Sequence, residues 1–484
     1  MQKKYLFNLN NITKEALAGL VVGFAIIPEA IAFSLIAGVN PKVGIYASIC
    51  ILLVTAFAGG RPALISAATG AMALLMIDLV KGYGLEYLMV AGILAGIFQI
   101  LFGILKIARF MSFIPRSVMV GFVNALAILI FMAQLDEIFK SNLLGLVIMC
   151  VALGIIYLFP LLPKIGKIIP SSLVAIIILT IISINAGFDV RMIKDLGELP
   201  SELPHFLIPN VPLNIQTLQI ILPYSLSLAV VGIMESLMTS NVLDELTATK
   251  SNKNRECIGQ GLANISTGFF GGMAGCGMIG QSMINVKSGA RTRLSTFLAG
   301  VYLCLIILFC ADFVNYIPMG VLVGIMIMVS ISTFDFISIR QLKSFPFSAN
   351  AVMIATVIAT ILTHNLAIGV LIGVLLEALF FANKVSYFLN CKKTLNGDIR
   401  VYKFYGQIFF RSADKFYSEF DFNENCKNVL IDVSNAHFWD ISAIYMLDKI
   451  KDRFQEKGAL VTLKGVNFAS SYMIKKFSVK DNID

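Results

Sequence analysis

Two segments of the chain combine small residues with a helical continuation in a way that suits anion binding. One is residues 63–75, Ala-Leu-Ile-Ser-Ala-Ala-Thr-Gly-Ala-Met-Ala-Leu-Leu, and the other is residues 271–282, Gly-Gly-Met-Ala-Gly-Cys-Gly-Met-Ile-Gly-Gln-Ser. Helix N-termini carry unpaired N–H groups and about half a positive charge. Two of them facing each other would therefore bind an anion without an arginine. The alternative is that the small residues only permit close helix packing.

The atoms expected to meet the anion are backbone N–H groups at the start of each helix. The candidate substrate-binding residues in these two segments are Ala68, Thr69, Ile279, Gly280, Gln281 and Ser282. Because glycine has no Cβ, the backbone at position 280 can approach a ligand closely. The segments therefore predict an anion site built mainly from backbone dipoles.

Two carboxylates, Glu29 and Glu235, lie well inside apolar stretches. A carboxylate within a membrane is energetically expensive and is expected to be functional. Glu235 and Thr239 are one helical turn apart, so their oxygens face the same way and suit a sodium ion, or a proton held by the carboxylate. Glu29 follows Pro28, which is expected to break its helix and expose backbone groups near the site. The alternatives are a hydrogen bond across the bundle for Glu235 and a structural role at the helix break for Glu29.

These candidate residues must be positioned by a membrane protein. Of the 484 residues, 57% are hydrophobic and only 14% are charged, and the mean hydropathy is +0.83. A soluble domain is about 25% charged, so a soluble enzyme is excluded. The sequence shows neither a nucleophile–base pair nor a metal-ligand cluster, so we expect no membrane enzyme either. The net charge of +9 is typical of cytoplasmic loops rich in lysine and arginine, and we expect no nucleic-acid partner.

Apolar runs long enough to cross a bilayer, which needs about 20 residues, recur along the chain. The first, 16–37, is interrupted only by Glu29. The charge-free runs that follow are 43–60, 62–77, 87–105, 117–135, 141–163, 168–188, 203–234, 257–286, 294–311, 313–334 and 344–376. The run 257–286 holds two spans broken at Phe270-Gly271-Gly272, and 344–376 holds two broken at His364-Asn365. The total is about 14 spans, with the two small-residue segments third and tenth, which points to an inverted repeat of two seven-span halves.

The distribution of basic residues predicts the orientation. With the N-terminus in the cytoplasm, 18 lysines and arginines fall on cytoplasmic segments and 5 on external ones. Cytoplasmic segments are normally the richer in these residues. Both termini are therefore predicted to be cytoplasmic, in an inner-membrane protein whose bundle is surrounded by lipid.

The composition changes near residue 390. The remaining 15 of the 38 lysines and arginines lie in 391–484, and strand-like patterns alternate there with helix-like ones. Strands are predicted at 400–405, 407–410, 427–433 and 459–463, and helices from about 412, at 440–457 and at 468–477. The sequence therefore predicts a transmembrane domain over 1–390 and a small cytoplasmic α/β domain over 391–484.

Several motifs resemble those of SulP-type anion permeases. They lie at residues 28–38, 41–48, 61–66, 113–122, 235–239, 244–247, 254–256, 259–264 and 285–293. The tail resembles a STAS domain, so the resemblance covers essentially the whole chain. It implies an all-α membrane bundle of about 14 transmembrane helices, arranged as a 7+7 inverted repeat with two half-helices. It also implies a core and a gate domain, commonly a homodimer, and elevator-like secondary transport of small anions such as sulfate or bicarbonate.

The resemblance also assigns roles to single residues. Glu29 stands where many relatives have a glutamine that lines the anion site, and Phe33 matches the aromatic residue of that site. Glu235 matches an acid of the eighth helix linked to cation or proton coupling. Thr239 matches a sodium-ligand threonine of bicarbonate-type members.

The chain departs from the family pattern in two places. Animal relatives carry an arginine near the start of the tenth helix, where this chain has Gln281. The expected pocket is therefore poorer in positive charge, which favours a co-bound cation. Soluble STAS proteins have an Asp-Ser-Ser-Gly turn whose first serine is phosphorylated, whereas Ile441 occupies that position here. We therefore expect no phosphorylation switch at that turn.

The sequence thus predicts an inorganic anion transporter coupled to sodium or protons, with no cofactor beyond the co-transported ion. Sulfate, bicarbonate and small carboxylates all suit opposed helix N-termini, so the identity of the anion stays open. One alternative is a dicarboxylate or nucleobase carrier on the same architecture. Another, from a different class, is a membrane sensor that binds an anion and signals through its tail.

Overall fold

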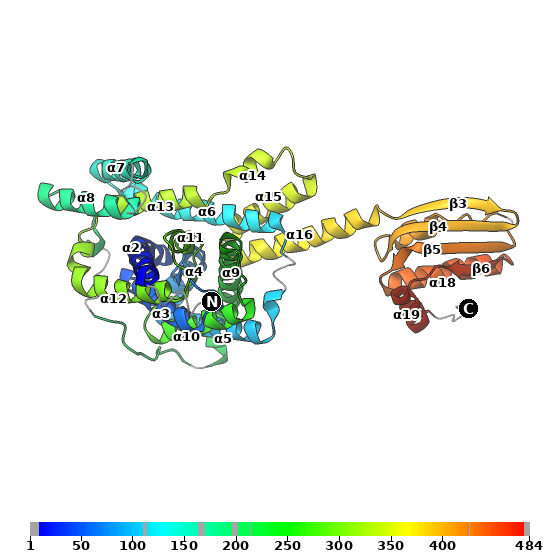
Figure 1. The fold of residues 1–484 in the computed structure, drawn as a ribbon, viewed down its shortest axis with the longest axis horizontal. Coiled ribbons are helices and arrows are strands. Elements are labelled where there is room, and N and C mark those ends of the chain that lie inside the picture. Colours follow the sequence, from blue (N-terminus) through cyan, green and yellow to red (C-terminus); the bar gives the residue numbers. More distant parts are fainter. Residues whose placement is uncertain are drawn as a thin grey trace. The chain divides into compact units, whose positions relative to one another are not determined.

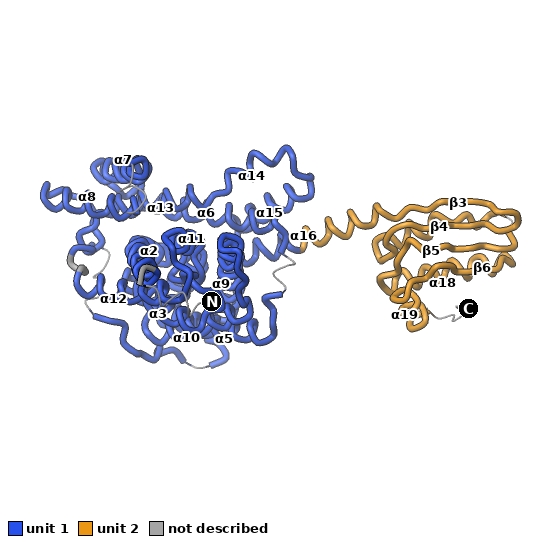
Figure 2. The backbone as a smooth tube through the Cα atoms, in the orientation of Figure 1, with its two compact units in different colours: residues 1–374 blue, residues 375–484 orange. Residues whose placement is uncertain are grey.

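The computed structural model describes residues 9–109, 114–162, 170–195, 202–212, 214–424 and 426–478, with helices and strands as labelled in Figure 1. The chain divides into two compact units, residues 1–374 and residues 375–484 (Figure 2). Lys3, Lys4, Lys164 and Lys167 of the cytoplasmic count and the start of the 113–122 motif lie outside the described residues.

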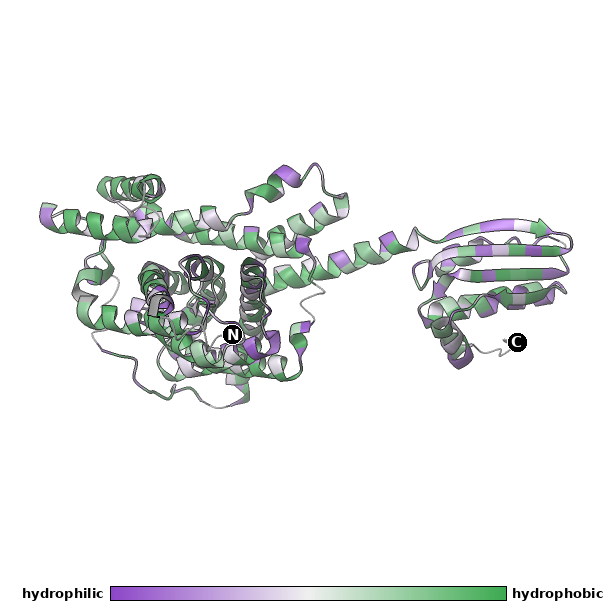
Figure 3. Ribbon diagram, in the orientation of Figure 1, coloured by the Kyte–Doolittle hydropathy of each residue, from purple (hydrophilic) through white to green (hydrophobic). Residues whose placement is uncertain are grey.

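The first unit consists mainly of helices with membrane-spanning character. Among the described residues, eight helices are long and apolar enough to cross a bilayer, and three shorter apolar helices accompany them. Figure 3 shows hydrophobic residues along most of the length of these helices. Such a surface is stable in lipid and not in water, which confirms a multi-pass membrane protein.

The helices of this unit fall into an earlier and a later series. The first series is α2 (Leu9–Ala37), α3 (Pro41–Ala58), α4 (Gly70–Tyr83), α5 (Leu85–Ile104), α6 (Arg116–Lys140), α7 (Leu143–Leu158) and α8 (Ser171–Ala186). The second is α9 (Ile215–Thr247), α10 (Lys253–Phe269), α11 (Ile279–Lys287), α12 (Leu294–Asn315), α13 (Met319–Thr333), α14 (Phe336–Gln341), α15 (Phe347–Thr363) and α16 (Leu366–Ser386), of which α16 runs from the first unit into the second. The short helices α4 and α11 are each the third of their series.

The helices of the first unit form two layers, as Figure 1 shows. α2, α3, α4, α5, α9, α10, α11 and α12 pack together in one layer, and α6, α7, α8, α13 and α15 in the other. In the first layer, a Cβ on Gly96 of α5 would lie 2.6 Å from the Gly261 carbonyl oxygen of α10. Glycine is therefore required for this close contact, as is common between membrane helices. The layers meet where α2 contacts α13 and α8, and where α4 contacts α6.

The predicted helix breaks inside the two long apolar runs are confirmed. α10 ends at Phe269, just before the Phe270-Gly271-Gly272 sequence, and α15 ends at Thr363, just before His364-Asn365. Gly271 has a φ of 75°, a left-handed conformation that glycine adopts without the steric cost of a Cβ.

Two predictions about single helices are wrong. α2 continues without a break through Pro28, because a proline inside a membrane helix removes one hydrogen bond and neighbouring helices can compensate. The run 203–234 is not one span, because α9 begins only at Ile215, where the Asn214 side chain caps the Thr217 N–H at 2.8 Å. The length of a charge-free stretch limits the length of a span, whereas the N-cap residue determines where within that stretch the helix begins.

The second unit is an α/β domain built on a four-stranded sheet with the order β3-β4-β5-β6. Its strands are β3 (Asn390–Asn396), β4 (Ile399–Ile408), β5 (Asn428–Phe438) and β6 (Leu460–Lys464), and its helices are α17 (Ala413–Ser418), α18 (Ile441–Glu456) and α19 (Phe468–Phe477). β3 and β4 are antiparallel, and the other neighbours are parallel. Tyr402, Phe404, Phe416 and Leu447 are fully buried in its core.

The predicted elements of this domain need two corrections. β3 was not predicted, because it is an edge strand whose polar residues are mostly exposed and show no alternation of apolar and polar positions. The predicted strands 400–405 and 407–410 fall in one strand, β4, which ends at Ile408 and has an irregularity in register between Lys403 and Tyr405. A glycine at position 406 suggested the end of a strand, but Gly406 pairs with Ala436 inside β4. Its φ of 115° is a conformation that glycine adopts without the steric cost of a Cβ.

Candidate anion-binding site

The two small-residue segments come together as a short antiparallel ribbon. β1 (Ser66–Ala67) pairs with β2 (Cys276–Gly277), so that Ala67 lies opposite Cys276. The ribbon is packed tightly, because a Cβ on Gly275 would lie 2.1 Å from the Ala67 carbonyl oxygen. Since β1 leads to α4 and β2 leads to α11, both short helices begin beside the same ribbon.

A cavity of about 230 Å³ lies where α4 and α11 begin. From the first layer it is lined by Glu29, Phe33, Thr69, Gly70, Glu235, Met238, Met278, Ile279, Gly280, Gln281 and Ile284. From the second layer it is lined by Phe122, Val123, Leu126, Ile130, Met328, Val329, Ser332 and Thr333. Seven of the ten residues singled out from the sequence therefore share one cavity: Glu29, Phe33, Thr69, Glu235, Ile279, Gly280 and Gln281.

The first turns of both short helices present backbone N–H groups at this cavity. The N-cap residue of α11, Met278, makes no side-chain capping hydrogen bond to the described residues, and first-turn N–H groups have no partner within their own helix. At α4, the Thr69 hydroxyl caps the Met72 N–H at 3.4 Å. A Cβ on Gly280 would have no described atom within 4 Å, so the cavity reaches the backbone there. This arrangement provides the dipoles that an anion requires.

Glu29 and Gln281 form a hydrogen-bonded pair between α2 and α11. The Gln281 side-chain amide donates to the Glu29 carboxylate, and both side chains are buried. Phe33, one turn along α2, is also buried and adds an aromatic surface to the cavity. The amide at position 281 is therefore engaged by a carboxylate.

Glu235 is linked to both small-residue segments. The Cys276 thiol of β2 donates to Glu235 Oε2 at 2.8 Å, and the Thr69 hydroxyl at the start of α4 lies 3.5 Å from the same oxygen. The Thr69 oxygen and the Cys276 sulfur are 3.0 Å apart. Sequence reasoning missed Cys276, because cysteines in apolar runs are usually small core residues. The sequence feature that could have identified Cys276 is its position between two glycines of the second small-residue segment.

Three of the candidate residues lie behind the cavity wall. The Ala68 N–H donates to the Ser48 hydroxyl at 3.3 Å. The Thr239 hydroxyl donates to the carbonyl oxygens of Glu235 and Gly277, at 2.8 and 3.1 Å. The Ser282 hydroxyl accepts the Ile65 N–H at 2.9 Å. None of the three lines the cavity, so the structure places them as supports of the ribbon and of α9.

None of the site residues expected from the sequence lies in the second layer, although α6 and α13 form one wall of the cavity. That wall is apolar apart from Ser332 and Thr333 near the end of α13. The available signal was the 113–122 motif, because its last residue, Phe122, lines the cavity. The cavity thus lies between the layers, with its polar groups mainly on the α4 and α11 side.

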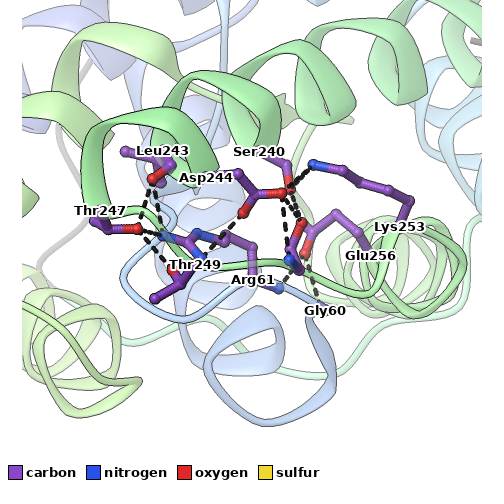
Figure 4. Close-up of polar contacts among 10 residues, drawn as sticks. Gly60, Arg61, Ser240, Leu243, Asp244, Thr247, Thr249, Lys253 and Glu256 are labelled. Carbon is purple, nitrogen blue, oxygen red and sulfur yellow. Dashed lines mark hydrogen bonds and ion pairs between the residues drawn. The ribbon is translucent and has the colours of Figure 1, made fainter. Parts of the chain in front are cut away.

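A polar cluster in which Arg61 and Glu256 are buried, and Asp244 and Lys253 partly buried, fixes the loop that leads from α3 to the ribbon (Figure 4). The Glu256 carboxylate accepts the Gly60 and Arg61 N–H groups at 2.7 and 2.9 Å. The Arg61 guanidinium contacts Asp244 at 3.0 Å, and Lys253 contacts the other oxygen of the same carboxylate at 2.9 Å. Figure 4 shows these side chains converging from the α3–β1 loop, the end of α9 and the start of α10. Buried charges are tolerated when they are paired in this way, and the loop is thereby held in one position.

Comparison with known proteins agrees with this architecture. The chain matches the Sulfate permease family over residues 12–145 and 139–356 and a STAS domain over residues 390–484. It is 50% identical over 468 residues to "Putative sulfate transporter YbaR" of Bacillus subtilis (strain 168), with 97% of each chain covered.

The solved structures that are similar to this chain include two anion transporters. The transmembrane domain of a cyanobacterium bicarbonate transporter, BicA, matches with a TM-score of 0.66 and 27% identity, over 74% of this chain and 98% of that one. Murine Solute Carrier 26 family member A9 has the same fold, with a TM-score of 0.83 and 16% identity, over 96% of this chain and 87% of that one. Given these matches over most of its length, the chain belongs to the sulfate permease family of anion transporters, and it is not an enzyme.

Proposed function

We propose that this protein is a secondary active transporter of small inorganic anions, such as sulfate or bicarbonate, across the inner membrane. The observation that carries the proposal is that the N-termini of α4 and α11 open at one cavity beside Phe33 and Gly280. Unpaired N–H groups at helix N-termini bind small anions. The relatives described above are named for sulfate and for bicarbonate transport, which favours anions of this class.

The carboxylates at the cavity favour coupling to a proton or to sodium. Glu29 and Glu235 both line the space in which the anion would sit. Like charges at close range in a poorly solvated site repel strongly, so the anion needs a compensating proton or cation. We assign the coupling role to Glu235, because its contacts with Cys276 and Thr69 connect it to both small-residue segments. Thr239 would support that site through its hydrogen bond to the Glu235 carbonyl oxygen.

The proposed mechanism is elevator-like movement of one layer against the other. The layer that contains α4 and α11 would be the core, and the layer that contains α6 and α13 would be the gate. The helices from α2 to α16, without the six-residue α14, would form fourteen spans arranged as a 7+7 inverted repeat. The antiparallel pairing of β1 with β2 suits two half-repeats of opposite direction. The cavity lies where the layers meet, so sliding would expose it to alternate sides.

A basic end of the bundle supports the proposed orientation. Arg255 donates to the Ala58 and Phe57 carbonyl oxygens at 3.1 and 2.9 Å, and Arg293 donates to the Ala56 carbonyl oxygen at 3.1 Å. The guanidinium groups of Arg255, Arg293 and Arg61 therefore lie together at the C-terminus of α3, where positive charge is favourable. In the proposed orientation the basic end of the bundle, both chain termini and a STAS domain that begins near residue 391 lie in the cytoplasm. We propose further that the protein is a homodimer.

Uptake into proteoliposomes tests the proposal. Labelled sulfate and labelled bicarbonate are supplied separately, with and without an inward sodium gradient and an inward proton gradient. The expected result is accumulation of one of these anions that disappears when an ionophore removes the coupled gradient. Binding without uptake would favour a sensor, and uptake restricted to dicarboxylates or nucleobases would favour the other type of carrier.

A further inference from the structure

The second unit carries an exposed group of aromatic side chains beside the end of α16. Phe381, Phe410 and Trp439 are 67%, 62% and 64% exposed. Together with Phe409 and Val385 they line an apolar recess of about 500 Å³. We call these five residues the aromatic patch. Large rings that remain exposed in this way mark a surface that is covered by another apolar phase.

The aromatic patch is held in place by the fold of the domain. The Trp439 N–H donates to the Ile408 carbonyl oxygen at 3.0 Å, and the Trp439 indole N–H donates to the Gln407 side chain. The Phe410 N–H donates to the Asp440 carboxylate at 2.6 Å. The rings at the ends of β4 and β5 are therefore presented in a fixed arrangement.

The position of the aromatic patch relative to a bilayer follows from α16. This helix has 21 residues with the hydropathy of a membrane span, and its length of about 31 Å matches the hydrocarbon thickness. Its last turn therefore lies at the level of the lipid headgroups. Phe381 and Val385 are one turn apart near this end, and Asn383 accepts a hydrogen bond at 3.1 Å from Arg411, which follows Phe410. The loop after β4 is thus tied to the part of α16 that leaves the membrane.

The chemistry of the surroundings suits a lipid interface. Tryptophan is enriched at the boundary between headgroups and hydrocarbon, and phenylalanine side chains of surface-bound segments are buried at the same depth. Lys384 precedes Val385 and Arg411 follows Phe410, and both basic side chains are exposed. Such groups are attracted to lipid phosphates. Asp440 is the acidic residue that lines the recess, and its carboxylate already accepts the N–H groups of Phe410 and Ala443.

We propose that the aromatic patch is an interfacial anchor that inserts into the headgroup region of the bilayer that α16 crosses, and so holds the STAS domain at the membrane surface. Neither the anion site nor the coupling ion enters this argument, and no residue of the aromatic patch lines the anion cavity. A failure of the proposed transport function would therefore leave this inference unaffected.

The chain contains a single tryptophan, Trp439, so its intrinsic fluorescence reports directly on the aromatic patch. The full-length protein is placed in nanodiscs of phosphatidylcholine brominated near the carbonyl end of the acyl chains, and in matched nanodiscs without bromine. We expect a blue-shifted emission that the brominated lipid quenches and that aqueous iodide does not. Quenching by iodide but not by the brominated lipid would overturn the proposal. Protection from both quenchers would also overturn it, because a protein surface would then cover the tryptophan.

Variants that keep Trp439 test the aromatic patch as a unit. Phe410→Ser and Phe381→Ser each replace an exposed ring, so both should fold, and both should lower bromolipid quenching and shift the emission to the red. Phe468→Ser is the matched control, because Phe468 is an exposed phenylalanine on α19 (92%) and does not line the recess. It should leave both signals unchanged. Unaltered quenching in both Phe410→Ser and Phe381→Ser would show that the rings do not act together at a membrane.

Discussion

The Gln281 side-chain amide on α11 donates a hydrogen bond to the Glu29 carboxylate on α2, at the wall of the cavity. Relatives with an arginine at the position of Gln281 and a glutamine at that of Glu29 would present a positive charge there. In this chain both differences lower the positive charge of the pocket, and the Glu29 carboxylate is held by the Gln281 amide. The pair therefore has to be tested as a pair.

We expect Gln281→Arg alone to raise anion affinity less than Gln281→Arg combined with Glu29→Gln. In the single variant the guanidinium lies beside Glu29 and is neutralised, whereas in the double variant it is left for the anion. A charge-assisted hydrogen bond contributes about 1.5–3 kcal/mol, or roughly 10- to 150-fold in affinity. Equilibrium binding of sulfate and bicarbonate to the wild type, both single variants and the double variant measures this coupling. Equal gains in the single and double variants would contradict it.

Glu235→Gln should reduce gradient-driven accumulation to the equilibrium level while the protein remains folded and inserted. The amide keeps the size of the side chain and can still accept the hydrogen bond from Cys276, but it cannot release a proton or balance a sodium ion. The free energy of unfolding should change by about 1 kcal/mol. The matched control is Glu245→Gln, at an exposed carboxylate of the same helix, which should transport normally. Concentrative uptake by Glu235→Gln at the wild-type level would remove Glu235 from coupling.

Gly280→Val should weaken anion binding without destabilising the fold. A Cβ at this position meets no described atom within 4 Å, so the added methyl groups would occupy the cavity beside the first-turn N–H groups. Loss of such a contact costs about 1–3 kcal/mol, roughly five- to 150-fold in affinity. Gly154→Val is the matched control, because a Cβ there also meets no described atom within 4 Å and Gly154 lies on α7 away from the cavity. Unchanged affinity in folded Gly280→Val would take α11 out of the site.

A truncated chain that ends at residue 389 should still bind the anion. Every described residue that lines the cavity belongs to the first unit, and none comes from the STAS domain. Affinity should remain within about threefold of the wild type, which corresponds to roughly 0.6 kcal/mol. The transport rate and the dimer stability of the truncated chain are measured in separate experiments. Complete loss of binding in a well-inserted truncation would show that the tail helps to build the site.

Asp432→Asn should destabilise the STAS domain at pH 7 by about 1–2 kcal/mol. Burial of the Asp432 carboxyl tends to raise its pKa, but the hydrogen bonds from Ser434 and the charges of Lys403 and Lys464 outweigh this effect, and the pKa lies below its ordinary value. A carboxylate with a lowered folded-state pKa stabilises the fold above the unfolded-state pKa of about 3.9.

This contribution disappears as the pH falls through the lower pKa of the folded state. The difference in thermal stability between wild type and Asp432→Asn should therefore be largest at neutral pH and should shrink below about pH 4. Thermal unfolding of residues 390–484 followed by circular dichroism measures it. Asp398→Asn, at an exposed turn carboxylate, is the control and should show little difference at any pH. A constant difference across the pH range would exclude the ionised carboxylate as the cause.

Much of the architecture was already determined by the sequence alone. The length and apolar content of the chain require a membrane-spanning bundle, because every backbone group in lipid must be paired within a helix or a closed barrel. The breaks at Phe270-Gly271-Gly272 and His364-Asn365 were predictable, since these residues disfavour a continuous helix locally. The α/β character of the tail followed from its periodicity, apart from the edge strand β3, whose exposed polar residues carry no such pattern.

The composition of the site was decided only by the tertiary structure. The sequence indicated that Glu29, Glu235 and the two small-residue segments mattered, because charges and glycines are conspicuous in apolar runs. It did not indicate that Gln281 bonds to Glu29, that Cys276 bonds to Glu235, or that α6 and α13 provide the opposite wall. These contacts join residues separated by tens to hundreds of positions. Periodicity assigns a residue to a face of its own helix, whereas the partner on that face depends on how distant helices pack.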